Sequence, residues 1–162
     1  MPAAPSTLSA LLSAGFTEEV AVLDGGLRLV EANATFLAAR AASLDAIRLH
    51  PCHEVLPGCA SSCRESRAEC PVHEAMETGG PVSLSVLDAQ VGGETRHLRI
   101  DVYPVPASIG EPPRILHITR DITRRVEDER LRERMWTEIL LHTDKLYASM
   151  LASHRDAGLA SR

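Results

Sequence analysis

The sequence has few aromatic residues, no long apolar run and no excess of positive charge. Its 162 residues include one Trp, two Tyr and two Phe, too few to expect a surface that stacks the bases of single-stranded nucleic acid. No stretch approaches the roughly 20 consecutive apolar residues that cross a bilayer. Residues 1–16 carry no positive charge that would begin a signal peptide. We therefore expect a cytoplasmic protein that does not contact a membrane.

The charge balance argues against nucleic acid as a partner, because the formal net charge is −5. The densest basic stretch, residues 120–134, interleaves its arginines with acidic residues, a pattern typical of a solvated helix face with ion pairs. The sequence also shows no Ser-His-Asp order, no phosphate-cradling loop and no carboxylate pair placed for catalysis. We therefore expect no enzymatic activity.

The length suits one domain with an appended helix. Residues 1–17 are expected to form an arm or a short helix, and residues 18–121 the folded domain. An amphipathic helix is predicted over 122–157, followed by a tail over 158–162. From Ile122 the chain has no Gly or Pro before Gly158.

Alternating apolar residues predict several strands. Two strands, 20–24 and 27–32, flank the turn sequence Asp24-Gly25-Gly26 and predict a hairpin. Asn33 then precedes residues 34–46, whose Ala and Leu content favours a helix, while residues 47–73 are expected to be irregular. A short helix should end at Gly79-Gly80. Three further strands are predicted around Val82, Leu84 and Val86, around Leu98, Ile100 and Val102, and around Ile115, Leu116 and Ile118.

The C-terminal helix carries an apolar stripe at steps of three or four residues: Leu131, Met135, Ile139, His142, Leu146 and Met150. Thr123 is a candidate N-cap. About 35 helical residues extend roughly 50 Å, too far to fold back onto a small sheet. We therefore expect this helix to form a homodimer with a second copy.

Three segments resemble the PAS family. Leu29-Val-Glu-Ala-Asn33-Ala-Thr-Phe36 is similar to the second strand and first helix of that family. Gly79-Gly-Pro-Val82 is similar to the link into its third strand, and Ile118-Thr-Arg-Asp121-Ile122-Thr123 to its Asp-Ile-Thr junction. The resemblance implies an α+β fold, with a five-stranded antiparallel sheet, short helices on one face and a long C-terminal signalling helix.

The segment Asp144-Lys-Leu-Tyr-Ala-Ser-Met150 resembles the one upstream of the phosphoacceptor box in PAS-linked histidine kinases. The box itself, His-Glu followed by Asn or Arg and Pro, is absent. This resemblance implies a two-component sensor that works with a downstream kinase or another output domain.

All four cysteines, Cys52, Cys59, Cys63 and Cys70, lie within 19 residues in the spacing C-x6-C-x3-C-x6-C. Thiolates are soft ligands that suit iron–sulfur clusters and zinc. In a cytosolic protein, such close spacing indicates metal or redox chemistry more than structural disulfides. These cysteines are our candidate cofactor ligands, and His53 and His73, at the edges of the same stretch, are possible further metal ligands.

Several sites fit these residues. A 4Fe–4S cluster would use all four thiolates. Zinc would use four cysteines, or three with His53 or His73, although the x6 spacings exceed the usual knuckle. A reversible disulfide needs only two of them, and four thiols could also simply pack as small apolar groups. Haem is disfavoured, because His73 is a lone candidate ligand and no Cys-x-x-Cys-His is present.

The surroundings of the cysteines resemble a subgroup of bacterial PAS domains with a cysteine-rich loop and a Cys-Pro before the last small helix. The matching segments are Cys52-His-Glu-Val-Leu56, Cys70-Pro71 and Thr78-Gly79. The leading hypothesis is therefore an input domain that senses redox state or oxygen through an iron–sulfur or other metal site. The alternatives are an interaction module with structural zinc and a thiol–disulfide switch without metal.

Overall fold

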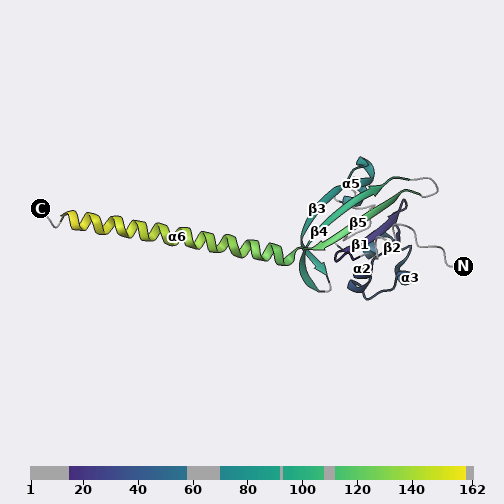
Figure 1. The fold of residues 1–162 in the computed structure, drawn as a ribbon, viewed down its shortest axis with the longest axis horizontal. Coiled ribbons are helices and arrows are strands. Elements are labelled where there is room, and N and C mark those ends of the chain that lie inside the picture. Colours follow the sequence, from purple (N-terminus) through teal and green to yellow (C-terminus); the bar gives the residue numbers. More distant parts are fainter. Residues whose placement is uncertain (1–14, 58–69, 92, 108–111, 160–162) are drawn as a thin grey trace. The chain divides into compact units, whose positions relative to one another are not determined.

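The computed structural model describes residues 15–57, 70–91, 93–107 and 112–159. The residues before the long C-terminal helix form a five-stranded antiparallel sheet in the order β2-β1-β5-β4-β3 (Figure 1). The strands are β1 (Glu19–Asp24), β2 (Leu29–Ala32), β3 (Val82–Val91), β4 (Glu94–Val105) and β5 (Arg114–Asp121). The short helices are α2 (Ala34–Ala39), α3 (Leu44–Ile47), α4 (Cys52–Val55) and α5 (Pro71–Thr78), and the long helix is α6 (Thr123–Leu159). The predicted α+β fold is confirmed.

The predicted first hairpin is also confirmed. Strand β1 pairs with β2, with a register shift between Val22 and Leu23. The side chain of Asp24 closes the turn, since its Oδ1 accepts hydrogen bonds from the backbone amides of Gly26 and Arg28 at 2.9 and 3.0 Å. An aspartate that binds nearby amides in this way favours a turn over a continued strand.

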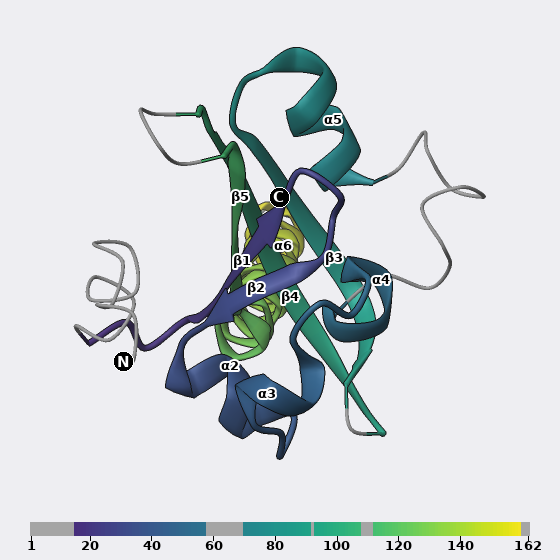
Figure 2. The same ribbon diagram turned by 90° about the vertical axis from the view of Figure 1, so that its right-hand side faces the viewer.

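The sheet has two different faces because its strands alternate. On one face, Ala21, Leu23, Ile100, Val102 and Ile115 join a core cluster with buried residues of the short helices. Figure 2 shows these helices around the sheet. The other face carries a smaller cluster of strand residues, with Val20, Val22 and Val30 packed against Leu116 and Ile118. We call these the inner and the outer face. Helices α2 to α5 therefore pack on the inner face only.

The prediction of one helix over residues 34–46 is wrong. The chain forms α2 and α3 instead, separated by Ala41 in the left-handed region at φ 47°. The break follows from a tertiary contact and a helix cap that propensity does not show. The Arg40 side chain bonds to α4 and β1, and Ser43 caps α3 by accepting a hydrogen bond from the Ala46 amide. The expected irregular stretch 47–73 likewise contains α4 and the start of α5.

The predicted end of α5 is confirmed. Gly79 is the C-cap with φ 67°, and its amide donates to the carbonyl of Ala75. A side chain at this left-handed position would be strained, so glycine terminates the helix here.

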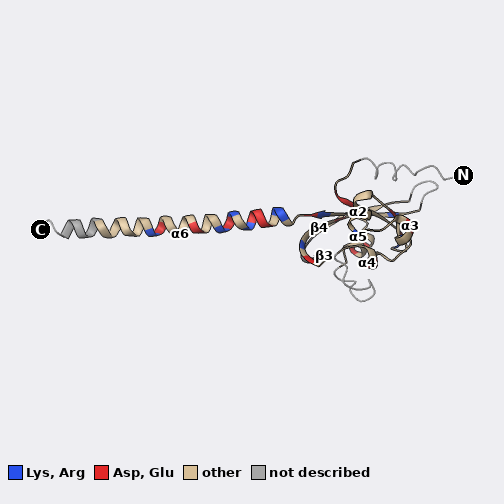
Figure 3. Ribbon diagram, turned by 90° about the horizontal axis from the view of Figure 1, so that it is seen from below, with Lys and Arg blue, Asp and Glu red and all other residues tan. Residues whose placement is uncertain are grey.

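The chain forms two compact units, Met1–Ile122 and Thr123–Arg162, which we describe separately. Helix α6 has 37 residues and begins at Thr123, the residue predicted to cap it. Its first turns are densely charged and its later turns much less so (Figure 3). Within the described residues, no helix is both long enough and apolar enough to span a bilayer.

Candidate functional site

Two of the four predicted cysteine ligands lie in the described structure, and both reach the inner face. Cys52 is the first residue of α4 and is fully buried, while Cys70 is the N-cap of α5 and is partly buried. Both pack in the core cluster that contains Phe36. Cys59 and Cys63 fall outside the described residues. The structure therefore places the two ends of the cysteine segment against one core.

The backbone before Cys52 is held against the first hairpin. The Cys52 amide donates to the carbonyl of Leu27 at 2.9 Å, the Leu49 amide to that of Leu29 at 2.7 Å, and the Leu29 amide to that of His50 at 3.0 Å. Leu27 and Leu49 both have positive φ, 60° and 65°. Bulky residues are rare in this conformation because their Cβ crowds the backbone. Tertiary hydrogen bonds therefore impose a strained path on the chain that leads into Cys52.

The predicted histidine ligands stay near the two cysteines in sequence but are not shown to join them. His53 lies in α4, with Nε2 3.9 Å from Oε1 of Glu54, and His73 lies partly buried in α5. In the described part of the chain, no three His, Cys, Asp or Glu side chains form a group that could hold a metal. Since Cys59 and Cys63 fall outside that part, a four-thiolate site stays a prediction.

Arg40 connects α4 to the sheet. Its Nε donates to the carbonyl of Val55 at 2.6 Å, and its Nη1 donates to Oε2 of Glu19 at 2.7 Å and to the carbonyl of Phe36 at 2.9 Å. The guanidinium carbon also lies 3.5 Å from the centroid of the Phe36 ring, a cation–π contact. One side chain thus joins the last residue of α4 to the first residue of β1.

Asn33 fixes the passage from β2 into α2. Its Oδ1 accepts from the amides of Val20 at 3.0 Å and Phe36 at 2.9 Å, and its Nδ2 donates to the carbonyl of Glu18 at 2.8 Å. The first two contacts are buried. Asn33 is therefore both the N-cap of α2 and a link to β1, which explains the Asn-x-x-Phe spacing.

His117 is a buried titratable residue that the sequence reasoning missed. It lies on the central strand β5, opposite Ala21 on β1 and Val102 on β4. Its Nδ1 is 3.4 Å from Oγ1 of Thr119. Burial, followed by the positive charge of Arg40, lowers the pKa of His117 from 6.5 to about 4. The alternation of Ile115, His117 and Thr119 was the signal that could have placed it on the inner face.

A polar network lies on the outer face. The Asp101 carboxylate is buried and accepts from Oγ of Ser83 at 2.6 Å and from Nε of Arg99 at 3.2 Å. Nη1 of Arg120 lies 3.6 Å from the same carboxylate. Burial raises the pKa of Asp101, but the bonds from Ser83 and Arg99 and the charges of both arginines outweigh burial and lower it. Strands β3, β4 and β5 are thus joined through one carboxylate.

The predicted Asp-Ile-Thr junction is held at its start by β4. The Ile122 amide donates to the carbonyl of His97 at 2.8 Å. Nη1 of Arg96 donates to Oδ2 of Asp121 at 3.2 Å, and Nη2 of Arg96 donates to Glu94. The last residues before α6 are therefore bound to the neighbouring strand.

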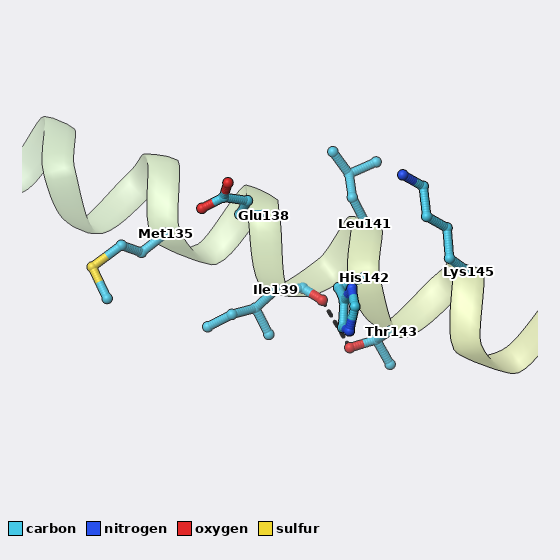
Figure 4. Close-up of a pocket in the computed structure, with 7 residues that line it drawn as sticks. All are labelled: Met135, Glu138, Ile139, Leu141, His142, Thr143 and Lys145. Atoms are coloured by element: carbon cyan, nitrogen blue, oxygen red, sulfur yellow. Dashed lines mark hydrogen bonds between the residues drawn. The ribbon is translucent and has the colours of Figure 1, made fainter.

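Helix α6 offers a surface of a different kind. Met135 and Ile139 point to one side of the helix, and Glu138 and Lys145 point to another (Figure 4). Thr143 is turned back on the helix, since its Oγ1 donates to the carbonyl of Ile139 at 2.8 Å. Met135 and Ile139 are each more than half exposed. A shallow groove with exposed apolar side chains suits a packed helix better than an enclosed small ligand.

Comparison with known proteins shows which structures this architecture resembles. A search of curated proteins finds no match. Among solved structures, the chain is similar to the PAS domain of Bordetella pertussis BvgS (23% identity, TM-score 0.53, covering 79% of this chain and 93% of that one). It is similarly related to the PAS domain of nitrogen regulation protein NR(II) from Vibrio parahaemolyticus (22% identity, TM-score 0.50, covering 72% and 99%). A domain of an HTR-like protein from Haloarcula marismortui matches at 20% identity and a TM-score of 0.50, covering 67% and 100%.

These identities are low and show the fold alone. The family model of the PAS fold matches residues 17–127, more than half of the chain. That range runs from just before β1 through the Asp-Ile-Thr junction and into α6. The chain belongs to the PAS family.

Proposed function

We propose that the chain is a sensory module of a bacterial-type signal-transduction protein, with an input site in the cysteine segment and an output through α6. Membership of the PAS family supports the sensory role, and the resemblance to kinase-linked sensors supports a kinase or other output domain as the partner. The observation that carries the proposal is the position of Cys52 and Cys70, which both pack in the inner core cluster.

The signal in this proposal is the redox state or oxygen, and the centre is an iron–sulfur cluster held by Cys52, Cys59, Cys63 and Cys70. Cys70 is the N-cap of α5, and the partial positive charge of a helix N-terminus favours a thiolate. Loss or oxidation of the centre would alter the packing at the starts of α4 and α5. Arg40 offers the route onward, because it binds the end of α4 and the start of β1.

The output in this proposal is a homodimer formed through α6. Ten large apolar residues of α6 are exposed, between 47% and 66% each, and a second copy of the same helix would cover those on the side of Ile139 and Leu146. A change at the centre counts as a signal only if it favours one of two arrangements of such a dimer.

The spectrum and metal content of anaerobically purified protein test the centre. An iron–sulfur cluster gives iron, sulfide and absorption near about 400 nm, which bound zinc does not give. Cys→Ser changes at positions 52, 59, 63 and 70 should each remove most of the metal, since one missing ligand opens the site. Zinc without a visible spectrum would support the structural-zinc alternative. No metal, with only two of the four changes affecting thiol oxidation, would support a disulfide switch.

Stability provides a second readout, because a group that binds only the folded protein raises the melting temperature. All four variants should melt below the metal-loaded wild-type protein, and Cys52→Ser also below the metal-free one, because serine places a hydroxyl in the core. Met76→Leu is a matched control, since Met76 is an exposed residue of α5 away from its N-terminus. This control should keep both the metal and the wild-type melting temperature.

A further inference from the structure

The apolar residues of α6 repeat every 11 residues. Four of them recur in the same order: Met135, Trp136, Ile139 and Leu140 return as Leu146, Tyr147, Met150 and Leu151. Each of these eight side chains is 47% to 66% exposed. An 11-residue repeat makes three turns at about 3.67 residues per turn, close to the period of a straight α-helix, so equivalent residues stay on one side of it. The exposed side chains therefore form a continuous surface along two repeats.

A histidine interrupts this surface. His142 points to the same side of α6 as Met135 and Ile139 (Figure 4), and the equivalent position one repeat earlier holds Leu131. His142 is exposed, and within the described residues its imidazole has no hydrogen bond or ion pair. Thr143 beside it differs, because its hydroxyl already donates to the carbonyl of Ile139 at 2.8 Å. On this side of the helix, His142 is therefore the residue whose polar atoms still need a partner.

We propose that two copies of α6 pair in parallel and in register over residues 131–151, with the two His142 side chains facing each other, so that protonation of His142 weakens the dimer. The inference rests on the homodimer of the proposed function, in which an output domain follows α6 in each copy and the two C-terminal ends lie together. In-register pairing aligns both repeats, whereas a shift of 11 residues would leave one repeat uncovered. The residues one repeat before Met135 and Ile139 are Arg124 and Asp128, so the paired stretch begins after them.

Two facing imidazoles make such an interface sensitive to pH. A neutral imidazole has one donor and one acceptor, so two His142 rings can share a hydrogen bond, and a polar residue at one interface position favours a single register. Histidine takes up a proton between about pH 5 and 8, and two protonated rings would place like charges together in an interface that excludes water. The nearest charged groups, Glu138 and Lys145 of each copy, have opposite signs and point to another side of the helix (Figure 4). They therefore offset little of this repulsion.

Analytical ultracentrifugation of the complete 162-residue chain at about pH 7.5 and about pH 5.5 tests the pH dependence. For the wild-type protein we expect the dimer dissociation constant to rise about tenfold or more at the lower pH, because association must remove protons from two imidazoles. His142→Leu should form a tighter dimer and lose most of this change, and His142→Lys should associate weakly at both pH values. His50→Gln is the matched control, since His50 is an exposed histidine of the sheet unit, and it should keep the wild-type change.

Photo-crosslinking from p-benzoylphenylalanine in place of Met135 tests the orientation. A parallel pair in register should give crosslinks to residues 131–139 of the second copy, whereas an antiparallel pair should give them near Met150. Crosslinks near Met150 would overturn the inference, as would an equal pH change in the wild-type protein and His142→Leu, and either result would leave the proposed homodimer standing. A wild-type protein that is monomeric at the higher pH would overturn both. Circular dichroism at each pH shows whether a variant is folded, so a lost interface is distinguished from a lost fold.

Discussion

The sheet unit and α6 use apolar residues in opposite ways. In the sheet unit, alternating strand residues meet the short helices and become buried, as Leu23, Phe36 and Val102 do. In α6 the apolar residues recur at helical spacing, yet Leu131, Ile139 and Leu146 are 51% to 55% exposed. The same hydrophobic driving force acts on both sets. The difference is that the sheet unit contains its own packing partners, whereas the apolar side chains of α6 stay exposed, as the proposed dimer requires.

The two halves of α6 sharpen this contrast. Between Thr123 and Arg134 the only large apolar residues are Val126 and Leu131, and the rest are mostly charged. From Met135 to Leu151 apolar residues come in adjacent pairs, such as Met135 with Trp136 and Ile139 with Leu140. A stripe two residues wide covers more of the helix surface than a narrow coiled-coil seam. The proposed interface should therefore lie mainly in the second half.

The largest expected effect is on association. Glutamates in place of Ile139 and Leu146 should make the full-length chain monomeric in light scattering, because each interface would bury charges without partners. The same two glutamates at Thr137 and Ala148, on the opposite side of the helix, should leave the dimer intact. If the protein stays dimeric with the first pair of substitutions, the interface lies in the sheet unit and not in α6. Truncation after Arg124 should likewise give a monomer.

A smaller effect concerns the pH dependence of the sheet unit. The pKa of His117 is about 4 in the folded protein, below its ordinary value, so the unfolded chain takes up the proton first. The stabilisation that neutral His117 gives the folded protein is complete above about pH 6.5. The free energy of unfolding then decreases as the pH falls towards 4, by up to roughly 3 kcal/mol. Denaturant unfolding at both pH values should show this loss in the wild-type protein.

His117→Leu provides the comparison, since a neutral apolar side chain cannot take up a proton. The variant should lose less stability than the wild type between pH 6.5 and 4, although other groups still titrate in both proteins. Equal slopes would mean that the folded protein accepts the proton on His117 without penalty. Helix α6 should not contribute to the difference, and its association should be the same in both proteins.

The smallest expected effect lies at the junction. Arg96 binds Asp121 and Glu94 but is 41% exposed, and water screens ion pairs of this kind. Arg96→Gln should therefore leave the melting temperature unchanged at both low and high salt. A clear loss of stability at low salt alone would show that the junction is more strongly held than its exposure implies.

The sequence predicted what depends on periodicity and turn chemistry. Strand alternation, the Asp24-Gly25-Gly26 turn and the left-handed Gly79 all led to the correct elements. It did not predict the break after α2, because alanines favour helix and the cause is a tertiary contact of Arg40. For the same reason neither Arg40 nor His117 was recognised as part of the inner face. The spacing of the cysteines indicated a site, and the structure adds that Cys52 and Cys70 reach one core.

The strand order has a consequence for how the chain folds. Strands β1 and β2 form one local hairpin and β3 and β4 another, but β5 lies between them and pairs Ala21 with His117. The two hairpins can form early, whereas the sheet closes only when the last strand is inserted. Such long-range closure is slow compared with hairpin formation. During synthesis, the edges of β1 and β4 that pair with β5 therefore stay unpaired until residues 114–121 have emerged from the ribosome.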